Sequence, residues 1–90
     1  MGSLTWREVA RLGPGVRVRF SEPFEVCPER VFPAGTAGTI AANDLNELSG
    51  DLYILPDDPR QRIVLGQWDG CIHLSAPTDG WEQAAPIGLA

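Results

Sequence analysis

The sequence predicts a mainly β fold, a single small domain over residues 1–90 with a short N-terminal helix and a five-stranded small barrel. Short apolar runs recur about every ten residues with turn-forming residues between them, as in small barrels and sandwiches. The ten glycines and eight prolines lie between these runs rather than in one tract. This spread indicates frequent turns and not disorder. The length suits one barrel and leaves no room for a second domain.

The helix is predicted over about residues 6–12. Thr5 can cap its start, and Glu8 stands three residues later, which completes a capping box. Gly13 suits the left-handed position after the helix, and Pro14 prevents continuation. Two turns are too short to persist alone, so the helix must pack its apolar side against the rest of the chain.

The first strand is predicted over Val16–Phe20, where apolar residues alternate with Arg17 and Arg19. This alternation indicates a half-buried strand with a cationic outer face. Further strands are expected over Thr36–Ala42, Leu52–Leu55, Ile63–Leu65 and Cys71–Leu74, and a last short one over Trp81–Gln83. Residues 84–90 contain Pro86 and Gly88 and are expected to form a loose tail.

Three prolines and three glutamates fall within Ser21–Pro33. Since proline cannot donate to a β-ladder, this stretch is predicted to be a long loop. A loop of this length in a small domain is frequently functional. Asn43–Gly50 is expected to be a loop or a single helical turn, and Pro56–Pro59 a tight turn.

The chain is acidic, with a formal net charge of −5. Residues 1–30 carry five arginines and four glutamates (+1), whereas residues 31–90 carry two arginines and eight acids (−6). An acidic body repels phosphate backbones, which makes nucleic acid an unfavourable partner. Neither a signal-peptide pattern nor a run of about 18 apolar residues is present, so no membrane contact and a cytoplasmic location are expected.

Residues suited to chemistry are few. Cys71 and His73 alternate onto one strand face, but no neighbour in sequence orients the imidazole. Zinc takes about four cysteine or histidine ligands, and the chain has two cysteines and one histidine. Cys27 and Cys71 are expected to be reduced thiols, with a single disulfide as the alternative. We therefore expect no enzyme, no catalytic residues, no cofactor and no metal.

Three segments together resemble small SH3-like barrels: Gly13–Arg17, Pro33–Ile40 and Trp68–Leu74. The resemblance covers about Gly13–Trp81 and is nearest to uncharacterised domains of bacteria, phages and plasmids. It implies that Gly35 and Gly38 are structural residues at the entry to a barrel strand. Peptide-binding members carry paired tyrosines in the first long loop and a Trp-Trp pair. Here that loop has phenylalanines and Trp68 stands alone, which argues against polyproline recognition.

A non-enzymatic protein-interaction module is the favoured function, and an origin on a mobile element is consistent with the resemblance. The residues expected to contact a protein partner are Trp68, Asp69, Phe24, Phe32, Asp57 and Asp58. The alternatives are an acidic inhibitor or nucleic-acid mimic that binds a basic protein, and a small enzyme or enzyme subunit. Homo-oligomerisation is left open by the sequence.

Overall fold

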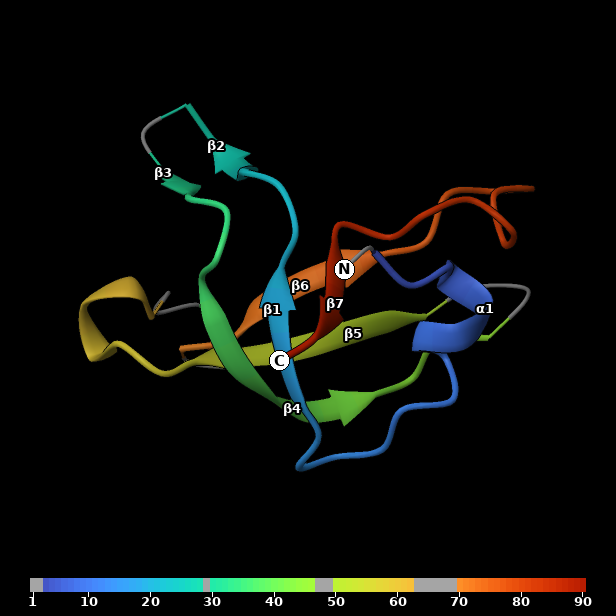
Figure 1. The fold of residues 1–90 in the computed structure, drawn as a ribbon, viewed down its shortest axis with the longest axis horizontal. Coiled ribbons are helices and arrows are strands. Elements are labelled where there is room, and N and C mark those ends of the chain that lie inside the picture. Colours follow the sequence, from blue (N-terminus) through green and yellow to red (C-terminus); the bar gives the residue numbers. More distant parts are fainter. Residues whose placement is uncertain (1–2, 29, 47–49, 63–69) are drawn as a thin grey trace.

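The computed structural model describes residues 3–28, 30–46, 50–62 and 70–90. The described chain is mainly β with one short helix, as predicted (Figure 1). The elements follow the order α1 (Trp6–Val9), β1 (Arg17–Phe20), β2 (Phe24–Cys27), β3 (Arg30–Phe32), β4 (Ala37–Asn43), β5 (Asp51–Pro56), the 3-10 turn η1 (Pro59–Gln61), β6 (Ile72–Ser75) and β7 (Ile87–Leu89).

The described strands form two open sheets and not the predicted closed barrel. Five strands lie in the antiparallel order β6-β5-β4-β1-β7, and β2 and β3 form a separate two-stranded sheet. The edge strands β6 and β7 pair with β5 and β1 respectively and not with each other. The predicted closed barrel is therefore not formed by the described strands, and β2 and β3 lie outside the larger sheet. The predicted strand Ile63–Leu65 lies outside the described residues.

Strands β1, β4, β5 and β6 occur within one or two residues of their predicted positions. In β1 the side chains of Val18 and Phe20 are buried and those of Arg17 and Arg19 are exposed, as the alternation predicted. The apolar faces of these strands, α1 and β7 enclose one core. Its buried apolar members are Trp6, Val9, Val18, Phe20, Phe32, Ile40, Leu45, Leu52, Ile54, Ile72, Leu74, Ala85 and Ile87.

The N-terminal helix begins where the capping box predicts. The Thr5 amide donates to Glu8 Oε1 at 2.8 Å, and the Glu8 amide donates to Thr5 Oγ1 at 3.2 Å. The helix ends at Val9, three residues before the predicted end, and Asn43 Nδ2 donates to the carbonyls of Val9 (3.0 Å) and Leu12 (2.7 Å) beyond it. Gly15, at φ 92°, adopts the positive φ that was predicted for Gly13.

The prediction of a loop over Ser21–Pro33 was wrong. This stretch contains the β2–β3 hairpin, with Phe24 opposite Phe32 and a bulge between Glu25 and Cys27. Its prolines fall outside the paired positions: one precedes β2, one follows β2 in the turn, and one follows β3. The prolines therefore delimit the two strands and do not prevent them.

The prediction of a loose tail over residues 84–90 was also wrong. Strand β7 pairs with β1, and Ala85 and Ile87 are fully buried. The Ser21 amide donates to the Pro86 carbonyl at 2.9 Å. Pro86 takes part in this contact as an acceptor only, which does not require a backbone N–H. Trp81–Gln83 forms a turn and not the expected strand.

Two glycines shape the corner that leads into β4. Gly35 has φ 92°, a conformation that side chains disfavour. A Cβ at Gly38 would lie 2.7 Å from the Leu55 carbonyl oxygen, so only glycine fits against β5 there. Both glycines are therefore part of the scaffold, as the sequence predicted. Among the described residues, no helix is long and apolar enough to cross a membrane.

Candidate functional site

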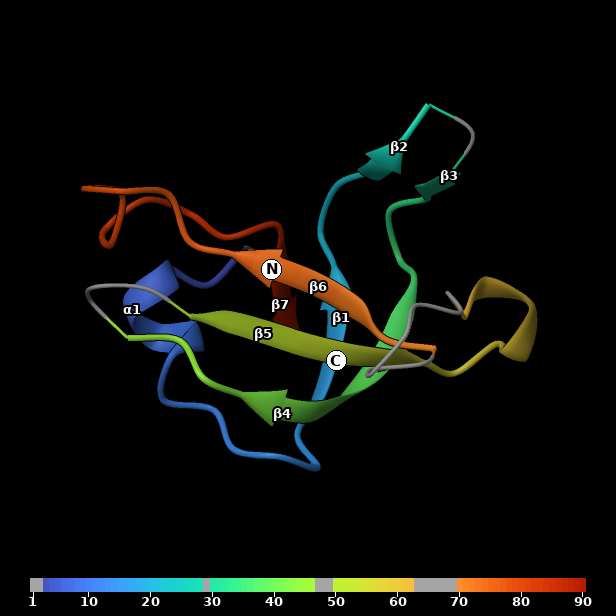
Figure 2. The same cartoon turned by 180° about the vertical axis from the view of Figure 1, so that it is seen from behind.

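The β2–β3 hairpin extends away from the five-stranded sheet (Figures 1 and 2). Three aromatic rings fix its base. Phe20 of β1 stacks on Phe24, with ring centroids 5.3 Å apart and an interplanar angle of 20°, and on Phe32, at 6.5 Å and 11°. Phe32 is only 2% exposed, and Phe24 is half-buried against the core. These two predicted partner residues therefore anchor the hairpin in this structure.

The exposed apolar side chains of the hairpin are Val26 and Val31, at 43% and 52%. Val26 is the extra residue of the bulge, and Val31 lies opposite the exposed Glu25. Of the three large apolar side chains that are exposed in the described part of the chain, two are on this hairpin. Both valines fall within the segment that was predicted to be a loop, and neither was expected to contact a partner. The sequence signal that could have indicated strands here was the presence of two β-branched residues between prolines.

The two aspartates of the Pro56–Pro59 turn pair with arginines of the same chain. The Arg17 guanidinium donates to both carboxylate oxygens of Asp57, at 2.6 Å and 2.5 Å. The hydrogen bonds from Arg17 hold the pKa of Asp57 below its usual value. Asp58 caps η1 by accepting from the Arg60 amide at 2.9 Å, and hydrogen bonds from the Arg60 side chain lower its pKa. Both predicted contact residues thus already have charged partners.

Trp68 and Asp69, the other predicted contact residues, lie outside the described residues.

Cys71 and His73 lie close in sequence but in different surroundings. Cys71 is 4% exposed, and burial raises the pKa of its thiol, which disfavours the nucleophilic thiolate. His73 packs edge-on against Tyr53, with ring centroids 4.6 Å apart at 86°. Within the described ranges, no three His, Cys, Asp or Glu residues cluster in a way that could hold a metal ion.

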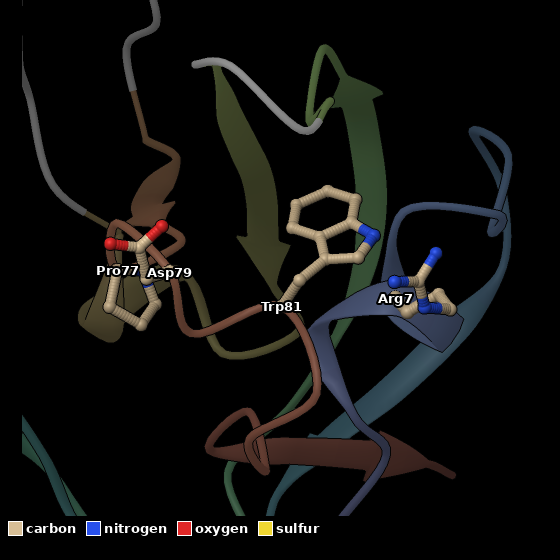
Figure 3. Close-up of a pocket in the computed structure, with 4 residues that line it drawn as sticks. All are labelled: Arg7, Pro77, Asp79 and Trp81. Atoms are coloured by element: carbon tan, nitrogen blue, oxygen red, sulfur yellow. The ribbon is translucent and has the colours of Figure 1, made fainter.

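A shallow pocket of about 220 Å³ lies between α1 and the loop before β7 (Figure 3). Arg7, Pro77, Asp79 and Trp81 line it. Backbone hydrogen bonds tie the loop to α1: the Arg7 amide donates to the Trp81 carbonyl at 3.0 Å, and the Trp6 amide donates to the Gln83 carbonyl at 3.0 Å. The pocket combines residues more than 70 positions apart, which is why sequence reasoning did not find it.

No protein-family model, curated protein or solved structure matches this chain. The resemblance to SH3-like barrels therefore has no support beyond the small β-rich fold itself.

Proposed function

We propose that this protein is a non-enzymatic interaction module whose β2–β3 hairpin binds an extended, basic segment of a protein partner. The observation that carries this proposal is the exposure of Val26 (43%) and Val31 (52%) on a hairpin that is fixed to the core. Burial of such side chains against a partner is favourable, at roughly 25 cal/mol per Å² of apolar surface.

The anchoring of the hairpin supports a binding role. Stacking of Phe24 and Phe32 on Phe20 holds both strands against β1. A partner then meets a preformed surface and loses less conformational entropy on binding than it would with a mobile loop.

The backbone of the hairpin also suits an extended ligand. In the described ranges, β2 pairs only with β3, and β3 only with β2. Strands with one unpaired edge accept an additional strand, with main-chain hydrogen bonds supplying affinity and side-chain contacts supplying specificity. A partner strand beside the hairpin would place alternate side chains over the exposed valines.

The charge of the hairpin favours a basic ligand. Glu25 of β2 and Glu22, two residues before β2, are exposed, and the whole chain carries −5. Arg30 of β3 is half-buried and donates to the Arg62 carbonyl at 2.8 Å, so it faces its own chain. Complementary charge raises association rates and selects partners. The expected motif alternates apolar side chains with lysine or arginine.

An SH3-like ancestry, a mobile-element origin and a cytoplasmic location belong to this proposal, and the small β-rich fold is what supports the first of them. The acidic-inhibitor alternative relies on the same negative charge as this proposal, and two observations weigh against it and against an enzyme. Asp57 and Asp58 are paired internally, and the thiol pKa of Cys71 is raised.

Selection from a displayed library of random peptides tests the proposal. We expect wild-type protein to enrich alternating apolar and basic sequences. The double variant Val26→Thr/Val31→Thr keeps the β-branched shape and should weaken the best peptide about tenfold.

Leu89→Thr is the matched control, because Leu89 is 61% exposed on β7, away from the hairpin. It should leave affinity within about twofold. Equal losses in the two variants, or full binding by the double variant, would overturn the proposal.

A further inference from the structure

We propose that the pocket lined by Arg7, Pro77, Asp79 and Trp81 is a second binding site that receives one arginine or lysine side chain of a peptide. It lies on the far side of the molecule from the hairpin, beside α1 (Figures 1 and 3). The site does not depend on the proposed hairpin function.

Asp79 provides the negative charge. Its side chain is exposed, and no hydrogen bond or ion pair involves it in the described part of the chain. This distinguishes it from Asp57 and Asp58, whose carboxylates bind arginines of the same chain. An unpaired carboxylate at the wall of a pocket can accept hydrogen bonds from an ammonium or guanidinium group.

Trp81 provides the aromatic surface. Its indole is half-buried, packs partly against the core, and stands between Asp79 and Pro77 on one side and Arg7 on the other (Figure 3). Tryptophan is the ring that attracts cations most strongly through its face. The Pro77 ring adds an apolar wall against which the methylene stem of lysine or arginine can lie.

Arg7 would repel a cation, but its charge is compensated. Its Nε donates to Glu82 Oε2 at 2.5 Å. The three charged groups around the pocket, Arg7, Glu82 and Asp79, therefore sum to one negative charge. This same pairing makes the pocket a poor anion site.

The pocket is formed before any ligand arrives. The Gly80 amide donates to the Pro77 carbonyl at 3.1 Å, and the Gln83 amide donates to the Gly80 carbonyl at 3.0 Å, so two turns hold the loop. Asp79 has φ 60°, a left-handed conformation that aspartate and asparagine tolerate better than most residues. A side chain at Gly80 would collide with the Pro77 ring.

The size of the pocket points to a single side chain. Its volume is about 220 Å³. Pockets for whole small-molecule ligands hold roughly 300–1,000 Å³. A lysine or arginine side chain with its peptide backbone outside the pocket fits better than a complete metabolite.

Titration of the intact protein with three short peptides, followed by ¹H–¹⁵N NMR, tests the site. The probes are acetyl-Gly-Arg-Gly-amide, acetyl-Gly-Lys-Gly-amide and acetyl-Gly-citrulline-Gly-amide. The arginine and lysine peptides should shift the Trp81 indole N–H and the Asp79 amide. Citrulline has nearly the shape of arginine without its charge and should bind at least about fivefold more weakly.

Asp79→Asn retains the tolerance for positive φ and removes the charge. It should weaken the arginine peptide about three- to fivefold. Glu25→Gln removes the same charge from the hairpin and should leave this affinity unchanged, as should Val26→Thr/Val31→Thr. Equal binding of citrulline, unchanged affinity in Asp79→Asn, or shifts confined to other residues would overturn the proposal. The hairpin proposal would stand in each of these cases.

Discussion

The five-stranded sheet and the β2–β3 hairpin differ in how far their apolar side chains are buried. In the sheet, Leu52 and Ile72 are fully buried in the core. In the hairpin, Val26 and Val31 remain largely exposed. Both regions are regular β-structure, so secondary structure does not explain the difference. Burial of apolar side chains stabilises the sheet. The exposed valines of the hairpin gain little from folding, so folding does not account for them.

The polar surfaces of the two regions differ as well. On the sheet, Arg17 forms a salt bridge with Asp57 and donates to Thr39 Oγ1 (2.9 Å), so the charge of Arg17 is matched within the chain. On the hairpin, the exposed Glu22 and Glu25 form no salt bridge among the described residues. The core of the sheet is closed by its own side chains, whereas the outer side chains of the hairpin are exposed, as the proposed binding role requires.

The largest expected effect is in the sheet core. Leu52→Ala should lower the free energy of unfolding by about 2–5 kcal/mol, since it removes a fully buried side chain and leaves a cavity. Chemical denaturation measures it. A loss below about 1 kcal/mol would show that β5 does not lie at the centre of the core.

The next effect concerns the junction between α1 and the sheet. Asn43→Ala should cost about 2–3 kcal/mol, because three hydrogen bonds are lost: to the Val9 and Leu12 carbonyls and from the Leu45 amide (3.0 Å). Asn46→Ala is the matched control at an exposed position and should change stability little. Equal losses for the two variants would refute the role of Asn43.

A smaller effect is expected at the base of the hairpin. Phe24→Ala should cost about 1–2 kcal/mol, because it removes the stack on Phe20 and part of the packing beneath the hairpin. Native-state hydrogen exchange should accelerate at β2 and β3 amides while protection in β4 and β5 persists. Uniform acceleration across the sheet would mean that the hairpin is part of the same cooperative unit.

The smallest expected effect is the pH-dependent contribution of the Asp57–Arg17 pair to stability. The folded pKa of Asp57 lies below its unfolded value of 3.8, so its pairing with Arg17 stabilises fully above that value. The contribution is lost as the pH falls through the lowered pKa. Asp57→Asn should therefore lower stability slightly at neutral pH, where the pairing is complete, and the difference from wild type should vanish as the pH falls through the lowered pKa. An effect that grew between pH 6 and 8 would contradict this assignment.

The sequence predicted the elements that depend on local signals. The Thr5–Glu8 capping box, the alternation in β1 and the glycine corner before β4 are encoded within a few residues of one another. The hairpin and the tail were missed because proline and glycine content suggested irregular chain. Their pairing with the rest of the fold is decided by Phe20 and β1, which are distant from the tail in sequence.

The candidate sites were harder to predict for the same reason. Phe24 and Phe32 were predicted as contact residues, whereas their orientation toward Phe20 depends on tertiary packing. The pocket at Trp81 requires the loop to dock on α1 through the Arg7 and Trp6 amides. No local pattern specifies such a contact between the two ends of a chain.

The most direct test of the account compares stability with peptide binding in Val26→Thr/Val31→Thr. Thermal unfolding should match the wild type, since the two valines are 43% and 52% exposed. Calorimetric titration with the best selected peptide should show an affinity about tenfold lower. Full affinity, or a loss of stability comparable to that of Leu52→Ala, would contradict the claim that the hairpin serves binding and the sheet serves folding.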